Sequence, residues 1–176
     1  MNEAGALAAT NIHFVEQGIS LLDDISDDLY VNVDSPHHKS GVGRHMRHVL
    51  EHYIALLSHS EGRVDYDARK RDEELETDRL HAISVAQQVA GQLEALTAGA
   101  DQKLLIKNNE IGERGDYCWS RSSFGRELQF MISHTVHHYA LIAIILRIQG
   151  YTPDEYFGVA PSTLRYETQL QDRPTG

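Results

Sequence analysis

Two groups of histidines in this sequence have the spacing that places metal ligands on one face of a helix. In the downstream group, His134 and His138 lie four residues apart in a stretch that leads into the most apolar segment of the chain. Residues four apart project side by side from an α-helix, so these two imidazoles can reach the same ion. No Glu follows His134, so the motif of the zinc proteases is absent.

The upstream group contains His45, His48 and His52, at spacings of three and four residues. This spacing places them on one stripe of a predicted helix. Two helices that carry histidines and pack together can offer three ring nitrogens to one divalent ion and leave positions open for water or substrate. The alternative is that these are ordinary surface or hydrogen-bonded core residues, because an isolated pair at this spacing is a weak signal.

Four stretches with apolar residues at helical spacing must position these histidines. The expected helices cover residues 3–29, 40–62, 72–99 and 122–150. Residues 100–121 lack this spacing, and the short runs 103–107 and 116–120 indicate a small hairpin or an irregular crossover. Ser122 or Ser123 is expected to cap the fourth helix. The sequence therefore predicts an all-α fold, a four-helix bundle with a long crossover between helices three and four.

In this bundle we expect His48 from the second helix and His134 and His138 from the fourth to hold the ion. His137 does not fit the same face, because neighbouring residues of a helix point about 100° apart. His37 and His38 follow the first helix in a turn-rich loop and are expected to face solvent.

The length and charge of the chain limit its class. A chain of 176 residues suffices for one well-buried domain, which we expect over residues 1–176 with its core at about 3–150 and a polar tail after 160. The net charge of −10 argues against nucleic-acid and anionic membrane surfaces as partners. The longest apolar run, residues 140–146, is too short to span a bilayer. The single Cys118 excludes an internal disulfide and, with no signal peptide at the N-terminus, indicates a cytoplasmic protein.

A segment dense in charges of both signs, residues 64–76, leads into the third helix and includes its first turn. It contains Asp67, Arg69, Arg71 and Asp72. One interpretation is an exposed connector that leads into the first turn of a helix. The other is a cluster at the mouth of the histidine site, where an arginine could hold a substrate carboxylate through two parallel hydrogen bonds.

In order and spacing, His48 followed by His134-x-x-x-His138 resembles the DinB-like (damage-inducible, YfiT-like) metalloenzyme superfamily, and the helix end with Arg147 and Gly150 is similar as well. The resemblance covers the chain from the first helix to about Gly150. It implies a four-helix bundle, commonly in a homodimer, with a three-histidine site for nickel, zinc or a similar divalent ion. Carried over, the ligands are His48, His134 and His138. Some members of the superfamily are transferases or hydrolases that depend on the thiols bacillithiol or mycothiol.

The sequence departs from the simplest family pattern in its additional histidines, His45, His52 and His137. His52 is also correctly placed on its helix to be the first ligand, so the choice between His48 and His52 stays open. One of the groups that do not bind the ion, His52, Glu51 or His137, is expected to move protons during a reaction.

These features predict a protein that binds a divalent metal ion and is a metal-dependent enzyme for a small molecule, assisted by a low-molecular-weight thiol. The ion would act as a Lewis acid. Two alternatives remain, namely a non-catalytic metal- or ligand-binding protein and a helical interaction module with structural histidines. Imidazoles bind metal only when neutral, so affinity is expected to fall below about pH 6, and affinity that stays flat to about pH 5 would indicate a carboxylate such as Glu51.

The first helix carries a second narrow apolar seam besides its main stripe. Leu7, Phe14 and Leu21 recur every seven residues, a repeat that drifts only about 20° per heptad. The seam either forms the interface of a homodimer, the commonest soluble oligomer, or widens the face buried against the other helices.

Overall fold

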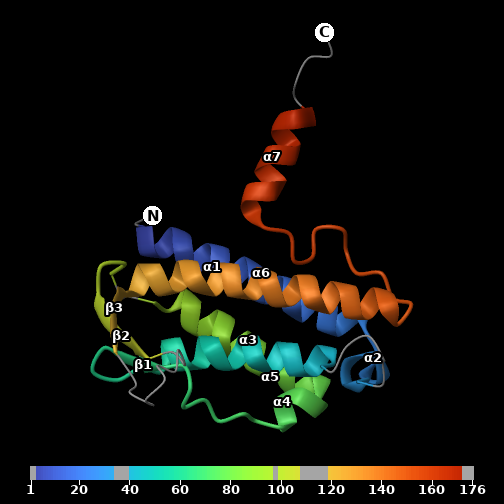
Figure 1. Ribbon diagram of the computed structural model, residues 1–176, viewed down its shortest axis with the longest axis horizontal. Helices are drawn as coiled ribbons and strands as arrows, with labels where there is room; N and C mark the ends of the chain where they lie inside the picture. Colours follow the sequence, from blue (N-terminus) through green and yellow to red (C-terminus); the bar gives the residue numbers. More distant parts are fainter. Residues whose placement is uncertain (1–2, 34–39, 97–98, 108–118, 172–176) are drawn as a thin grey trace, which may run out of the picture.

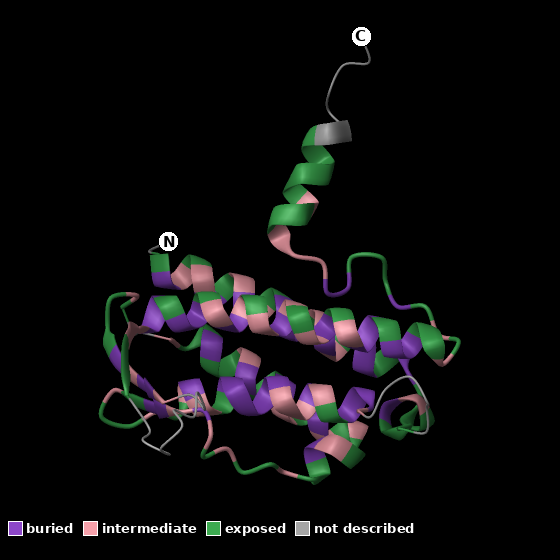
Figure 2. Cartoon of the chain, in the orientation of Figure 1, coloured by how far each residue is buried: buried purple, intermediate pink, exposed green. Residues whose placement is uncertain are grey.

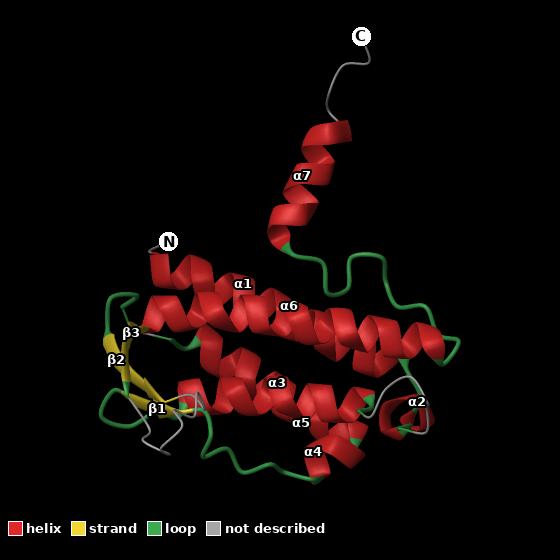
Figure 3. Cartoon of the chain, viewed as in Figure 1, coloured by secondary structure: helices red, strands yellow, loops and turns green. Residues whose placement is uncertain are grey.

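Helices make up most of the structure, a computed structural model that describes residues 3–33, 40–96, 99–107 and 119–171. Figure 3 shows these helices with a small sheet at one end. Along the chain the elements are α1 (Glu3–Asp24), α2 (Asp27–Val31), α3 (Val42–Leu57), β1 (Arg63–Asp65), α4 (Glu74–Thr77), α5 (Arg79–Glu94), β2 (Lys103–Lys107), β3 (Ser120–Ser123), α6 (Phe124–Ile148) and α7 (Pro161–Gln171). The predominantly helical class predicted from the sequence is therefore confirmed.

Four long helices enclose the core. Helix α1 packs against α5 and α6, and α3 packs against the same two helices. Buried positions lie along the facing sides of these helices, whereas α7 projects away from them and is mostly exposed (Figures 1 and 2). The histidines of α3 and α6 therefore lie on two helices that are in direct contact.

The first and third predicted helices are each divided in two, so these predictions were wrong in detail. Ser26 separates α1 from α2, and its side chain accepts a hydrogen bond from the N–H of Leu29 at 3.3 Å. Asp78 separates α4 from α5 and accepts from the N–H of His81 at 2.9 Å. A side chain that caps a new helix satisfies N–H groups which the preceding helix cannot reach, so the chain can change direction there.

The fourth predicted helix begins where the sequence placed it. Helix α6 follows Ser123, whose side chain accepts from the N–H of Arg126 at 3.3 Å, so this predicted cap is confirmed. Strands β2 and β3 form the predicted antiparallel hairpin. Of the predicted run 116–120, residues 116–118 lie outside the described part of the chain, and β3 instead continues to Ser123.

Strand β1 was not predicted from the sequence, and it corrects the interpretation of residues 64–76 as an exposed connector. It pairs in parallel with β2, with Val64 opposite Ile106, and the side chain of Val64 is buried. A parallel pairing between segments about forty residues apart depends on tertiary packing. The sheet therefore anchors the beginning of the charged segment that follows β1.

A chain of buried hydrogen bonds joins α1, α3 and α6. The Tyr53 hydroxyl on α3 donates to Asn11 Oδ1 on α1 at 2.8 Å, and Thr135 Oγ1 on α6 donates to the Tyr53 hydroxyl at 3.2 Å. The Asn11 amide also donates to the carbonyl of Leu128 at 3.1 Å. Tyr53 and Thr135 directly follow His52 and His134 in sequence, so these bonds fix the register of the two histidine helices.

The second seam of α1 is buried inside the chain. Phe14 and Leu21 are 2% and 5% exposed, and Leu7 is partly buried against the core. Tyr139 of α6 reaches this face, where its hydroxyl donates to the Phe14 carbonyl at 3.0 Å. The structure therefore supports the interpretation that the seam widens the buried face, and it contradicts a dimer interface built on these residues.

Helix α6 is long and apolar enough, by length and composition, to cross a membrane. It also contributes Leu128, Met131 and Ile142 to the protein core. Because the core helix of a soluble protein has the same composition, this one helix is weak evidence for a membrane span.

We expect Tyr53→Phe to lower the free energy of unfolding by about 1–3 kcal/mol, because it leaves the buried Asn11 and Thr135 side chains without their shared partner. Urea unfolding followed by circular dichroism measures this change. Tyr166→Phe, at a residue that is 59% exposed on α7, is the matched control. Equal stabilities of the two variants would show that the buried hydrogen bonds do not fix the helices.

Candidate metal centre

Helices α3 and α6 direct four imidazoles toward one another, His48 and His52 from the first and His134 and His138 from the second. The ring centroid of His48 lies 5.0 Å from that of His134 and 4.6 Å from that of His138. The rings of His52 and His134 are 4.2 Å apart. One ring nitrogen from each of His48, His52 and His134 lies within 4.8 Å of the others. The two groups predicted from the sequence thus meet, in an arrangement that allows a divalent ion to bind.

The ring nitrogens of these residues differ in their availability. Within the described part of the chain, Nδ1 of His134 is buried and has no hydrogen-bond partner. His52 is fully engaged: its Nδ1 donates to the His48 carbonyl at 2.6 Å, and its Nε2 accepts from Arg69 Nη1 at 3.0 Å. Since a carbonyl can only accept and a guanidinium can only donate, these contacts fix the tautomer of His52. Nδ1 of His138 lies 2.9 Å from Nδ1 of His45, which leaves Nε2 for other contacts.

Burial keeps all four imidazoles neutral well below the usual histidine range. Desolvation and, to a smaller extent, the nearby Arg69 lower the pKa of His48 to about 4. Desolvation likewise lowers the pKa of His52 to about 3 and those of His134 and His138 to about 2 and about 3. Neutral imidazoles are the form that binds metal. Protons therefore compete with the metal for these nitrogens only at a lower pH than the sequence indicated. Metal affinity that persists to pH 5 thus no longer implies a carboxylate ligand.

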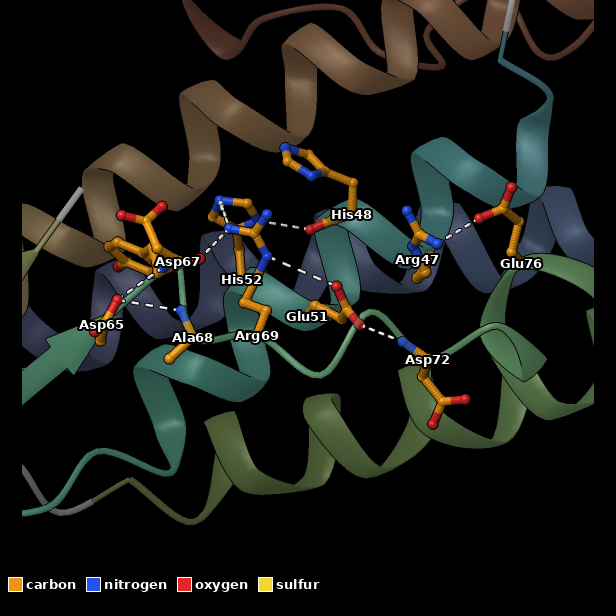
Figure 4. A network of polar contacts seen from close by, with 11 residues as sticks. Arg47, His48, Glu51, His52, Asp65, Asp67, Ala68, Arg69, Asp72 and Glu76 are labelled. Carbon is orange, nitrogen blue, oxygen red and sulfur yellow. Dashed lines mark hydrogen bonds and ion pairs between the residues drawn. The ribbon is translucent and has the colours of Figure 1, made fainter. Parts of the chain in front are cut away.

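The charged segment after β1 lies beside His52 and Glu51 of α3 (Figure 4). Arg69 reaches between His52 and Glu51, with its Nε 3.7 Å from Glu51 Oε2, and it also donates to the Tyr66 carbonyl. The other oxygen of Glu51 accepts from the N–H of Asp72 at 2.7 Å. Glu51 is only 5% exposed, so this predicted proton carrier holds the segment in place.

The arginines of this segment belong to the site, as the second interpretation of the charged segment proposed. Arg69 and Arg71 line a cavity of about 300 Å³ that also reaches His48 and His138. Asp67 does not line it; its backbone N–H donates to Asp65 Oδ1 at 3.0 Å. The sequence interpretation is thus supported for the position of the two arginines.

Tyr66, a neighbour of His52, and Glu127, the hydrogen-bond partner of Tyr66, were not identified from the sequence. Tyr66 stacks on the His52 ring, with centroids 5.2 Å apart, and its hydroxyl donates to Glu127 Oε2 at 3.0 Å. Ser122 donates to the other oxygen of Glu127 at 2.5 Å. An acidic residue on the apolar face of the fourth predicted helix was the available signal, because a buried carboxylate requires hydrogen-bond donors.

The remaining candidates lie at the edge of the site or away from it. His137 is exposed, and its ring lies 5.1 Å from that of His138. Trp119, which directly precedes β3, has Arg63 over its ring at 5.5 Å and does not line the histidine cavity. His37 and His38 lie outside the described residues.

A sequence model of the DinB family matches residues 20–164, a range that includes both histidine helices. The chain belongs to the DinB family. Among curated proteins, FK506-binding protein 5 of Rhizopus delemar is 32% identical to this DinB-family chain over 104 residues, which are 58% of this chain and 27% of that protein. The chain thus corresponds to only about a quarter of that relative. No solved structure matches it.

We expect the metal-free protein to lose stability as the pH falls from about 7 to about 5. The unfolded chain takes up protons near pH 6.5, whereas the buried imidazoles of the folded chain do so only near pH 4 or below. The unfolded state therefore binds more protons between these values, and the unfolding free energy falls with pH by at most about 1.4 kcal/mol per unit for each imidazole. Urea unfolding in a chelator at several pH values measures this slope.

His134→Gln removes one of these imidazoles and should give a shallower slope over the same range. The comparison uses slopes, so a change in overall stability does not affect it. Identical slopes in the variant and the wild type would contradict the assignment of this acid sensitivity to the histidine cluster.

Proposed function

We propose that this protein is a divalent-metal-dependent enzyme that acts on a small molecule, of the thiol-dependent transferase or hydrolase type, with nickel or zinc as its ion. The observation that carries the proposal is that two pairs of neutral imidazoles, from α3 and α6, lie together. One of these imidazoles, His134, has a buried ring nitrogen without a partner in the described chain. Such an atom costs free energy unless something binds it. We further propose that the four long helices form the four-helix bundle expected for the family.

We assign the ligands to His48, His134 and His138 rather than to His52. The Nε2 lone pair of His52 already accepts from Arg69, and an arginine beside the ion would repel it. Within the described residues no hydrogen bond engages the His48 ring, and Nε2 of His138 is likewise uncommitted. The three rings lie within 5.0 Å of one another, so small side-chain rotations can direct their nitrogens to one point.

A bound divalent ion supplies a Lewis acid that lowers the pKa of water or of a thiol. Among the three proton carriers considered, we propose His52, because its ring lies against those of His48 and His134. Release of Arg69 from Nε2 would free the lone pair for a proton. Glu51 would position Arg69, and the exposed His137 would serve only at the rim.

We expect His48→Ala, His134→Ala and His138→Ala each to lose most of the bound metal, because two imidazoles hold a divalent ion much more weakly than three. His52→Ala should keep it. His13→Ala, an exposed residue on α1, is the control. Elemental analysis of the purified proteins gives the metal content per chain. If His138→Ala kept its full metal content and His52→Ala lost the metal, the third ligand would be His52 and not His138.

Turnover separates an enzyme from a metal-binding protein without chemistry. Zinc- or nickel-loaded protein is assayed with a low-molecular-weight thiol and a panel of small electrophiles. We expect consumption of the thiol that is abolished in His134→Ala and strongly reduced in His52→Gln despite normal metal content. A loaded protein that is inactive throughout would favour the alternative of a metal sensor or store.

We also propose that the protein is a cytoplasmic homodimer, with an interface on faces other than the seam of α1. Light scattering at micromolar concentration should give a mass well above that of one chain, 19.8 kDa. Phe14→Glu and Leu21→Glu should unfold the protein, because both side chains are buried in the monomer. If either variant were a folded monomer, the seam of α1 would instead be part of the dimer interface.

A further inference from the structure

The cavity that is lined in part by His48 and His138 has a strong excess of positive charge. It has a volume of about 300 Å³ and reaches His48 and His138. Four of the residues that line it are arginines, Arg44, Arg47, Arg69 and Arg71. Among the described residues of the chain, Glu51 is the only carboxylate in this lining. This concentration of arginines occurs in a chain whose net charge is −10. The excess is therefore local to the cavity.

A neighbouring cavity shows that this imbalance is not general in the region. It has a volume of about 330 Å³ and shares Glu51 and Arg69 with the first. Its charged lining is balanced, with three cations against three carboxylates: Arg63, Arg69, Lys70, Glu51, Asp65 and Asp72. Of these two neighbouring cavities, the one that reaches the histidines therefore carries the positive excess.

Two of the four arginines have partners within the protein. Arg47 pairs with Glu76, 2.5 Å from its Oε2, and Arg69 is held by Glu51 and His52 (Figure 4). In the described part of the chain, Arg44 and Arg71 have neither an ion pair nor a hydrogen bond. These two guanidinium groups are therefore available to a ligand.

Backbone geometry places both available arginines beside the candidate ligands. Arg44 lies four residues before His48 on α3, so the two share one face of the helix. Arg71 has a φ of 53°, a left-handed conformation that a residue with a Cβ rarely adopts. The N–H of the next residue, Asp72, donates a hydrogen bond to the Glu51 carboxylate, which holds the backbone there. Such conformations are concentrated at functional sites.

We propose that this cavity binds an oxyanion group, a carboxylate or a phosphate, of the small molecule on which the protein acts. Arg44 and Arg71 donate the hydrogen bonds that hold this group. The planar guanidinium donates two parallel hydrogen bonds to either group. The volume is at the lower end of small-molecule sites, so the anionic group and the reacting part of the molecule lie close together. The inference rests on the proposed function, because it places the oxyanion next to the histidine site of that enzyme.

Calorimetric titration of the metal-free, full-length protein with inorganic phosphate and, separately, with acetate tests the proposal at constant ionic strength. We expect saturable binding of at least one probe, weakened about tenfold by Arg44→Gln or by Arg71→Gln and further by the double variant. The probe that binds more tightly identifies the group as phosphate or carboxylate. Arg165→Gln, at an exposed arginine on α7, is the control for the change in net charge and should bind as the wild type does.

Arg71→Gly separates recognition from folding. It removes the guanidinium and relieves the left-handed backbone, so we expect weakened anion binding with unchanged or increased stability. Unchanged anion binding in the double glutamine variant, or no binding of either probe to the wild type, would overturn the proposal.

Elemental analysis of the same proteins distinguishes this failure from failure of the metal site. If only the metal site is wrong, the wild type contains no metal but its metal-free form still binds the anion. If only the anion site is wrong, all the arginine variants retain metal and the titrations show no dependence on Arg44 or Arg71.

Discussion

The register between α3 and α6 depends on the buried hydrogen bonds that connect Asn11, Tyr53 and Thr135. A buried hydroxyl or amide without a partner costs more than a typical hydrogen bond contributes, so the three side chains must meet for the helices to pack. Tyr53 and Thr135 are the immediate neighbours of His52 and His134. The requirement to satisfy polar groups inside the core therefore also sets the height at which the imidazoles face one another.

The histidine cluster is costly for the fold, and its surroundings show how that cost is limited. Desolvation drives the pKa of each imidazole down, so the cluster exists as neutral rings at neutral pH. Arg69 lies beside them at the price of its own desolvation, which lowers its pKa. The nearby Glu51 carboxylate offsets this effect. Preorganised polar groups of this kind are typical of sites that bind ligands, where local stability is reduced.

The charged segment connects the small sheet to the site. Strand β1 anchors its beginning against β2, and the Glu51 carboxylate holds its end through the N–H of Asp72. Between these anchors the backbone carries Arg69 to the imidazoles and Arg71 to the cavity wall. The sheet thus has a clear structural role although it is small: it fixes the segment that adds positive charge to a negatively charged protein.

Local patterns in the sequence determined the helices and the two histidine groups. The spacing of His134 and His138 fixes their shared face in any α-helix, and the Ser123 cap is a contact between residues three apart. The order and spacing of the histidines also sufficed to indicate the DinB family, which the family match from residue 20 to residue 164 bears out.

Contacts between distant segments decided the rest. The pairing of β1 with β2, the burial of Phe14 in the chain's own core, and the contact of Arg69 with His52 join residues that local periodicity cannot relate. The same holds for the availability of the ring nitrogens. The sequence placed both His48 and His52 on the correct face of the helix, and only the tertiary structure shows that Nε2 of His52 accepts a hydrogen bond from Arg69. Helical spacing fixes the direction of a side chain, whereas packing determines what that side chain meets.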